Sequence, residues 1–175
     1  MDMFVEQIVA KQKGIKEYAI IFGSITALLI IVMFVLPYLL AFGPLAFLLL
    51  VGIGYGLWWL LTSLNIEYEY SVTNGDIDID RIIAKRKRKR IVSVRGSKIE
   101  VLEPYNAADY AARRFDRRVI AAPSPNSDML WCFSYRSKKG GHTLVVFQPE
   151  ERVLNALKSG LSVLVLREAN KKSAQ

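Results

Sequence analysis

Residues 18–65 contain no Asp, Glu, Lys, Arg or His, and most of their side chains are apolar. A water-soluble helix or sheet of that length would need polar side chains on its exposed face. The hydrocarbon core of a bilayer is about 30 Å thick, and a helix needs about 20 apolar residues to cross it. A break with turn chemistry, from Pro37 to Pro44, divides the segment. The sequence therefore predicts a transmembrane helical hairpin over residues 18–64, with crossings at 18–40 and 45–64.

The charges on either side of this hairpin predict its orientation. Lys11, Lys13 and Lys16 precede the first crossing and a run of six basic residues follows the second, whereas the link between the crossings is uncharged. Basic flanks stay on the cytoplasmic side of a membrane. We therefore expect a multi-pass protein of the cell (inner) membrane with both termini in the cytoplasm.

Small residues recur at four-residue spacing in both crossings, at Gly23 and Ala27 in the first and at Gly52 and Gly56 in the second. Such positions let helix backbones approach closely. Two interpretations stay open: the hairpin packs on itself, or it dimerises or docks on another membrane protein. Because neither crossing contains an ionisable residue, a transporter or channel acting alone is disfavoured.

Residues 1–17 are predicted to form an N-terminal interfacial amphipathic segment. In a helix, Phe4, Val5, Ile8 and Val9 would share one apolar face, which suits a short helix lying at the inner membrane surface. The alternative is a helix that packs on the soluble domain.

After Asn65 apolar and polar residues alternate, which is the period of a strand. The Asn74-Gly75 pair predicts a hairpin turn. Pro149, followed by Glu150 and Glu151, predicts the start of a C-terminal helix. The expected strands are 66–72, 76–80, 91–94, 99–102, 119–122, 129–135 and 142–147. We also expect a short helix, capped by Asn106, after the fourth strand. Residues 162–166 are either a strand or a continuation of the last helix.

This succession of strands with one closing helix resembles a pleckstrin-homology-like (PH-like) split barrel. The resemblance is to bacterial PH-like domains that follow a membrane hairpin, and it is carried by residues 70–79, by the basic strand before 91–94 and by residues 147–158. In detail, residues 4–8 and 74–90 resemble a Gram-positive bacterial membrane-protein family of unknown function.

The resemblance implies an α+β fold and no known activity. The fold would be a two-helix transmembrane hairpin followed by a PH-like antiparallel split β-barrel with a C-terminal helix. The barrel would form a cytoplasmic domain over residues 65–175.

The net charge of +8 lies entirely in residues 65–175, where 21 Lys and Arg outnumber 13 Asp and Glu. Its densest part is the run Lys85, Arg86, Lys87, Arg88, Lys89 and Arg90. In a strand these side chains would alternate between two faces, and neither face can be buried cheaply. We therefore expect an exposed hairpin end or sheet edge. Three roles stay open: contact with anionic lipid headgroups, a solvated run that pairs with local acids, and binding of an acidic protein or nucleic acid.

A second basic cluster, Arg113, Arg114, Arg117 and Arg118, surrounds Phe115. In one interpretation Phe115 inserts at the membrane interface while the arginines hold lipid phosphates. In the other, the cluster is an exposed helix end that Asp116 partly neutralises.

Asp76, Asp78 and Asp80 begin like a calcium-binding loop, but that loop needs Gly and Glu where Arg81 and Lys87 stand. We expect these carboxylates to pair instead with the basic run or with neighbouring strands.

The remaining chemistry is sparse. His142 is the only histidine and Cys132, within an apolar run, is the only cysteine. A zinc site would need further ligands of these types, so we predict no metal site and a buried, inert thiol at Cys132. We also predict no enzymatic activity, no catalytic residues and no cofactor.

The sequence favours a non-enzymatic, membrane-anchored PH-like adaptor or regulatory subunit at the cytoplasmic face. Both basic clusters would contact anionic phospholipids, and the domain would act as a scaffold for an unidentified protein partner. The alternative is an accessory subunit that docks through its transmembrane hairpin into a larger membrane transport or envelope-assembly complex. A homo-oligomer stays open, and no nucleic-acid partner is expected.

Overall fold

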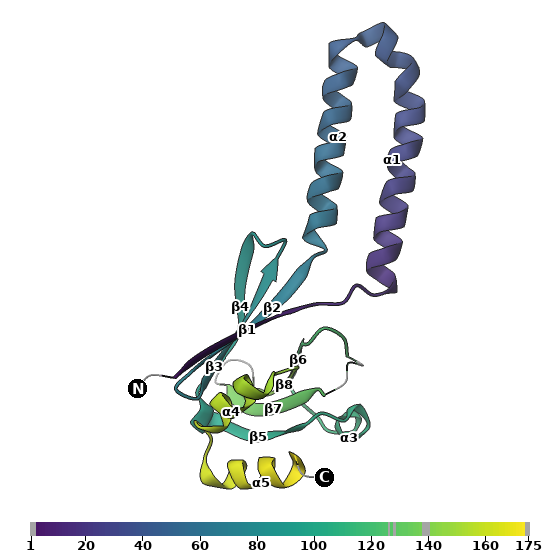
Figure 1. The fold of residues 1–175 in the computed structure, drawn as a ribbon. Helices are drawn as coiled ribbons and strands as arrows, with labels where there is room; N and C mark the ends of the chain where they lie inside the picture. Colours follow the sequence, from purple (N-terminus) through teal and green to yellow (C-terminus); the bar gives the residue numbers. More distant parts are fainter. Residues whose placement is uncertain (1–2, 126, 128, 138–140, 174–175) are drawn as a thin grey trace. The chain divides into compact units, whose positions relative to one another are not determined.

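The computed structural model describes residues 3–125, 127, 129–137 and 141–173 (Figure 1). The chain divides into two compact units. One unit, called the domain below, contains residues 1–11 and 67–175, and the other contains residues 12–66. The apolar segment is therefore an insertion after the first strand of the domain.

Two helices make up the apolar unit, α1 (Ile15–Phe42) and α2 (Pro44–Ser63). Gly43 alone separates them, with φ of 49°. The expected link from Pro37 to Pro44 is wrong in its extent, because α1 continues through Pro37. Pro37 removes one helical hydrogen bond, but the residues after it keep theirs. In an apolar segment the helix remains the cheapest way to satisfy the backbone.

Within the described residues, one helix is long and apolar enough to cross a membrane. It spans Ile15–Tyr38, 24 residues, and its most apolar 18-residue stretch has a mean hydropathy of 2.9 and no buried residue. A core helix of a soluble protein would bury that stretch. The apolar part of α2, counted over Phe47–Ser63, is shorter. The chain thus has one candidate membrane helix near its N-terminus, and the second crossing stays a prediction.

The first sheet has the strand order β1-β2-β3-β4. Its strands are β1 (Phe4–Ala10), β2 (Ile66–Thr73), β3 (Asp76–Ile83) and β4 (Lys87–Val94).

Strand β1 corrects the helix that the sequence predicted before the membrane segment. It pairs antiparallel with β2, from Phe4 opposite Thr73 to Ala10 opposite Glu67. Its residues alternate between solvent and the domain interior, with Gln7 buried. The apolar residues of this short segment fit the period of a helix as well as that of a strand. Pairing with β2 selects the strand.

The second sheet has the strand order β5-β7-β8-β6. Its strands are β5 (Ile99–Pro104), β6 (Arg117–Ala121), β7 (Trp131–Ser137) and β8 (Gly141–Phe147). β7 pairs antiparallel with β5 and with β8, but β6 pairs parallel with β8. The expectation of an entirely antiparallel domain is therefore wrong. Residues 105–116 carry the chain from one edge of the sheet to the other, so β6 escapes the hairpin geometry that imposes antiparallel pairing.

Short helices connect and cover the sheets. The 3₁₀ helix η1 (Gly96–Lys98) leads into β5, and α3 (Ala107–Ala111) follows it, with the Asn106 side chain accepting a hydrogen bond from the Ala108 N–H as expected. The C-terminal helices are α4 (Glu151–Lys158) and α5 (Val163–Ser173). The ambiguous residues 162–166 therefore belong mainly to a helix, which packs along β5.

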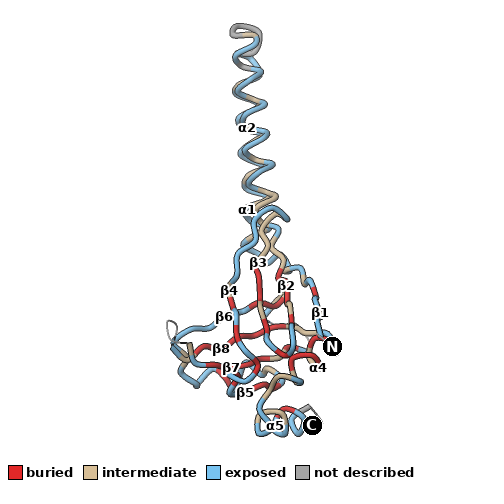
Figure 2. The backbone as a smooth tube through the Cα atoms, turned by 90° about the vertical axis from the view of Figure 1, so that its left-hand side faces the viewer, coloured by how far each residue is buried: buried red, intermediate tan, exposed pale blue. Residues whose placement is uncertain are grey.

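The core joins both sheets and α4. Tyr70 on β2, Phe133 on β7, Phe147 on β8 and Leu157 on α4 are all fully buried. The Tyr70 and Phe147 rings meet edge to face with centroids 5.7 Å apart, and Phe147 meets Phe133 at 5.3 Å. Figure 2 shows the buried residues concentrated in β2, β3, β7 and β8. On β3 and β4 the core includes Ile77, Ile79, Val92 and Val94, whereas residues 81–90, which carry the basic run, lie outside it.

Candidate functional site

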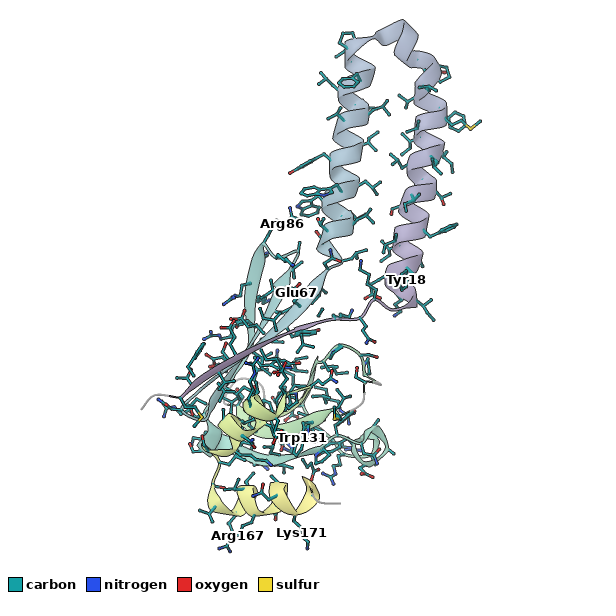
Figure 3. The ribbon with its side chains drawn as sticks, viewed as in Figure 1. Tyr18, Glu67, Arg86, Trp131, Arg167 and Lys171 are labelled. Atoms are coloured by element: carbon teal, nitrogen blue, oxygen red, sulfur yellow. The ribbon has the colours of Figure 1, made fainter. Side chains whose placement is uncertain are left out.

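The basic run lies at the β3–β4 turn and along β4, which is an edge strand of the first sheet. Lys85 and Arg86 belong to the turn, residues 87–90 belong to the strand, and all six side chains are exposed. Figure 3 shows Arg86 at the tip of this hairpin. Lys85 lies 3.9 Å from the carboxylate of Glu67. The run thus occupies a hairpin end and a sheet edge together.

One face of the hairpin pairs its arginines with acids. Arg88 lies 2.5 Å from the Glu69 carboxylate, and Arg90 lies 3.0 Å from both Asp78 and Asp80. Burial raises the pKa of Glu69, and the charge of Arg88 opposes that shift. The hydrogen bond to Asp80 raises the pKa of the Arg90 guanidinium. Acid pairing within this hairpin is therefore confirmed for Asp78 and Asp80.

The opposite face carries positive charge without acidic partners. Arg81 stands directly across from Lys89, and Ile83 stands across from Lys87. In the part of the chain that the structure describes, no carboxylate lies within ion-pair distance of these three basic groups, and the buried Nε of Arg81 has no hydrogen-bond acceptor. Like charges directly opposite each other destabilise a sheet. Arg81, Lys87 and Lys89, called the basic face below, therefore favour an anionic ligand.

The β3–β4 turn lies at the end of the sheet to which the apolar segment is attached. Ala10 opposite Glu67 is the last pair of β1 and β2, and Ile83 opposite Lys87 is the last pair of β3 and β4. Successive strands of an antiparallel meander reverse direction. The chain therefore leaves β1 and enters β2 at the same sheet end as the basic turn.

Much of the second basic cluster is built into the domain. Arg113 lies 3.6 Å from the carboxylate of Glu103 and 4.7 Å from the centre of the Tyr110 ring. Arg118 donates hydrogen bonds to the carbonyls of Tyr110 and Arg113, at 2.8 and 2.7 Å. Phe115 stacks on Tyr110 and packs against a buried cluster, so it does not project outward in this structure.

All four arginines of this cluster are exposed, but two are not tied to the domain by polar contacts. Arg114 and Arg117 make no hydrogen bond or ion pair through their side chains with other described residues. The prediction of lipid contact for the second cluster therefore depends on these two, because Arg113 and Arg118 contribute to the fold.

The four positions predicted for helix packing lie in open surroundings. Ala27 and Gly56 line an apolar space of about 240 Å³ between α1 and α2. A Cβ added at Gly23, Gly52 or Gly56 would meet no described atom within 4 Å. Contact between α1 and α2 therefore does not require these glycines, and docking on another protein stays a prediction.

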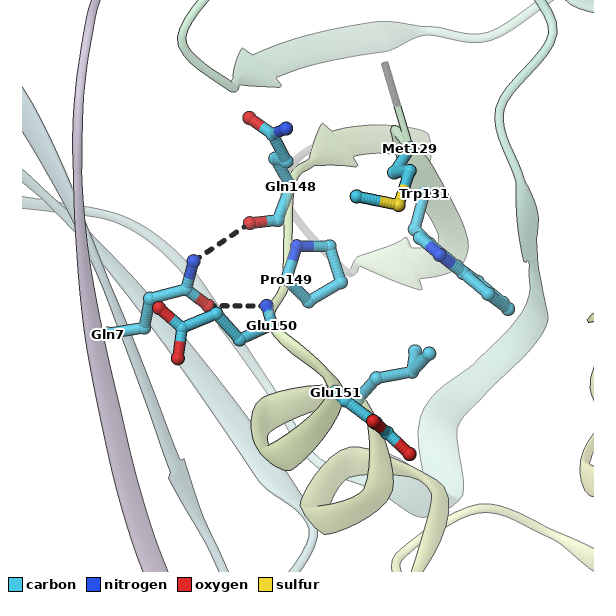
Figure 4. Close-up of a pocket in the computed structure, with 8 residues that line it drawn as sticks. Gln7, Met129, Trp131, Gln148, Pro149, Glu150 and Glu151 are labelled. Carbon is cyan, nitrogen blue, oxygen red and sulfur yellow. Dashed lines mark hydrogen bonds between the residues drawn. The ribbon is translucent and has the colours of Figure 1, made fainter. Parts of the chain in front are cut away.

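A groove on the domain was not predicted from the sequence. It has a volume of about 520 Å³ and lies between β1, the start of β7 and the segment that joins β8 to α4 (Figure 4). Its lining includes Gln7, Met129, Trp131, Pro149, Glu151 and Leu154. The only sequence feature that could have indicated this groove is the pair of large apolar side chains Met129 and Trp131, just before and at the start of β7.

Gln7 forms one wall of this groove. Its amide nitrogen donates to the carbonyl of Gln148 at 3.1 Å, and its amide oxygen accepts from the N–H of Glu150 at 2.7 Å (Figure 4). Strand β1 thereby holds the segment that begins α4. Sequence analysis missed this role because it assigned Gln7 to a helix.

The buried titratable groups serve the interior of the domain. Tyr110 and Lys172 both donate hydrogen bonds to the Glu103 carboxylate. Burial raises the pKa of Tyr110. Cys132 is fully buried, which confirms the expected burial of this thiol. Burial also raises the pKa of Cys132 to about 12, which favours an inert thiol.

Comparison with known proteins identifies a family. A family model described as a bacterial PH-like domain (DUF6106) matches residues 1–165. The match extends from β1 through the apolar helices and both sheets into α5. No curated protein and no solved structure gives a significant match. Two sheets followed by C-terminal helices fit a PH-like domain, whereas closure into a barrel and a Gram-positive origin stay predictions.

Proposed function

Because the chain belongs to this family of bacterial PH-like domains, we propose that it is a non-enzymatic, membrane-anchored adaptor whose basic face contacts anionic phospholipids. The apolar helices anchor the chain, and the domain acts at the cytoplasmic face as a scaffold for a protein partner.

The pairing of β1 with β2 supports two membrane crossings. Ala10 and Glu67 are neighbours in one sheet, so the chain before α1 and the chain after α2 lie on the same side of a membrane. A crossing by α1 alone would separate these strands. The 20 residues of α2 have about the length that a return across the bilayer needs, although its apolar part, Phe47–Ser63, is shorter than that of α1. The lysines before α1 favour the cytoplasm for both ends.

The observation that carries lipid contact is the position of the basic face at the attachment end of the sheet. Four residues join Ala10 to Ile15 and two join Ser63 to Ile66. Such linkers span at most about 15 Å, which keeps that sheet end near the bilayer surface. Each Lys or Arg near an anionic leaflet contributes about 1 kcal/mol. The acid-paired arginines contribute less, because their charge is already balanced.

Lipid contact is tested with the full chain in nanodiscs of phosphatidylglycerol or phosphatidylcholine. A fluorophore on Ala84→Cys reports contact through quenching by nitroxide-labelled headgroups, since buried Cys132 does not react. We expect stronger quenching in phosphatidylglycerol, and its loss in Lys87→Ser/Lys89→Ser.

The matched control is Arg167→Ser/Lys171→Ser, which removes the same charge from α5, far from Arg86 in Figure 3. Equal quenching in both lipids, or equal effects of the two double variants, would refute headgroup contact by the basic face.

A second candidate function is docking through α1 and α2 into a larger membrane complex. Glycine inside a helix costs about 1 kcal/mol relative to alanine, and Gly23 and Gly52 meet no neighbour that compensates for this cost. Gly23→Leu/Gly52→Leu should abolish co-purification of a membrane partner, whereas Leu49→Phe, a change at another exposed position, should not. An unchanged set of partners would eliminate this function.

A further inference from the structure

The groove beside β1 has the size and lining of a ligand site. Its volume of about 520 Å³ lies within the range of about 300–1,000 Å³ that small ligands occupy. Trp131, Pro149 and Leu154 supply apolar surface. Tryptophan and methionine are also enriched at the centres of protein interfaces.

Met129 at the rim is not explained by packing within the domain. The residue is 81% exposed, although its side chain is large and apolar. Its backbone has φ of 55°, a left-handed conformation that residues other than glycine rarely adopt. Such conformations occur preferentially at binding sites, where the surrounding structure holds them in place.

Apart from Met129, the residues that form the walls of the groove are fixed in place by contacts within the domain. Gln7 bonds the backbone on both sides of Pro149, and the Lys158 ammonium stands 5.5 Å from the centre of the Trp131 ring. A groove whose walls are already ordered loses less entropy when it binds a ligand.

The charge of the groove differs from that of the domain around it. Glu150 pairs with Arg152 at 2.8 Å, whereas Glu151 makes no ion pair with other described residues. Among the described residues that line the groove none is Lys or Arg, although basic residues dominate the chain, which has a net charge of +8, and Lys158 contacts only the ring of Trp131 there. The complementary ligand therefore combines apolar surface with positive charge.

We infer that this groove docks a peptide segment of a protein partner, in which an apolar side chain sits beside a Lys or Arg. The apolar side chain packs against Trp131 and Leu154, and the basic side chain meets Glu151. The inference rests on the adaptor role proposed above, and it is independent of lipid contact by the basic face.

The test selects a random heptapeptide library, displayed on phage, against the full chain in phosphatidylcholine nanodiscs. Binding of the selected peptides is measured by the fluorescence of Trp131 in a Trp58→Phe/Trp59→Phe background. Met129→Gly removes the rim side chain and suits the positive φ, so it should fold at least as well as the parent. Glu151→Gln removes one exposed charge.

We expect the selected peptides to pair an apolar residue with Lys or Arg. Met129→Gly and Glu151→Gln should each weaken binding about tenfold. The controls Leu164→Ala and Glu168→Gln, which change exposed side chains of the same kinds on α5, should leave affinity unchanged.

Each other outcome overturns part of the proposal. Peptides that bind equally to the Met129 and Glu151 variants would refute the groove but keep an adaptor. Acidic or uncharged peptides would refute the ligand chemistry. The absence of any selected peptide would count against both the groove and the adaptor role, while lipid contact is measured separately in phosphatidylglycerol.

Discussion

Three glycines meet backbone to backbone where the β2–β3 turn, η1 and the end of α4 converge. A Cβ on Gly75 would lie 2.2 Å from the Cα of Gly160, and one on Gly96 would lie 2.4 Å from the carbonyl oxygen of Gly75. Gly75 also has φ of 83°. The atoms in the way are backbone, so they cannot rotate aside as a side chain would.

Gly160→Ala should therefore lower the free energy of unfolding by about 2–3 kcal/mol, because overpacking must displace the end of α4. Chemical denaturation followed by circular dichroism measures the change. Asn170→Ala, on the exposed side of α5, is the control and should change it by less than about 0.5 kcal/mol. Equal stability of the two variants would show that the loops separate easily.

The lowered pKa of Glu103 predicts that the stability of the fold depends on pH. Burial tends to raise its pKa, but the hydrogen bonds from Lys172 and Tyr110 and the charge of Arg113 hold the pKa below its usual value near 4.5. A carboxyl group with a lowered pKa in the folded state stabilises the fold above its unfolded pKa, and this contribution is lost as the pH falls.

The Tm of the parent should thus fall more steeply than that of Glu103→Gln between about pH 5 and pH 3. The variant should already be less stable at pH 7, because it leaves Lys172 without its charge partner. Parallel melting curves for the two proteins across this range would contradict the prediction.

Among the elements, β1 has the largest consequence for the design of experiments. A fragment that starts at residue 65 lacks β1, which contributes an edge strand and the Gln7 contacts to α4. Ala10 and Glu67 are already paired, so a short Gly-Ser loop can replace residues 12–66.

We expect this loop-closed domain to fold cooperatively and to stay monomeric. Deletion of residues 3–10 should lower its Tm by more than about 10 °C, since it exposes β2 and leaves the start of α4 unbonded. Thermal unfolding and size-exclusion chromatography measure both effects. A deletion variant as stable as the loop-closed domain would show that β1 is dispensable.

Sheet edges are protected in two ways in this fold. α5 packs along β5, and β4 carries the exposed lysines and arginines of the basic run. Charged edge strands resist pairing with other chains. The basic run therefore has a structural effect in addition to the lipid contact proposed for it.

At the scale of the whole molecule, the strand pairing predicts an even number of membrane crossings. In intact cells, a membrane-impermeant maleimide should label Leu45→Cys, next to the turn between the helices, but should label Ala84→Cys only after the membrane is opened. Cys132 is buried and provides no background. Labelling of both positions under the same condition would refute a hairpin that crosses the bilayer.

The full chain should also stay with the membrane after extraction with alkaline carbonate. Its α1 exposes large apolar side chains, such as Phe22 and Phe34, over 70% or more of their surface, and water cannot solvate a helix of this kind cheaply. A chain that is monodisperse without detergent would contradict the anchor.

The sequence predicted the structure best where a single residue type determines the local backbone conformation. The Asn74-Gly75 turn, the cap at Asn106 and the helix start after Pro149 each follow from local backbone chemistry, and all three occur. The basic run could be placed on an exposed edge for the same reason. Sequence reasoning failed for residues 4–10, which form a strand and not a helix, and for the parallel pairing of β6, whose presence as a strand it did expect. In both cases the partner strand lies far away in the chain.

The sequence by itself determined that α1 is an apolar helix, that the rest is an α+β domain and that Cys132 is buried, because these properties depend on the composition and period of single segments. Only the tertiary structure decided that β1 is a strand, that the apolar helices are inserted behind it and that Arg88 and Arg90 are paired while Lys87 and Lys89 are not. It alone formed the groove beside Gln7. Each of these results depends on contacts between residues far apart in the chain, and no local pattern records which distant residues will meet.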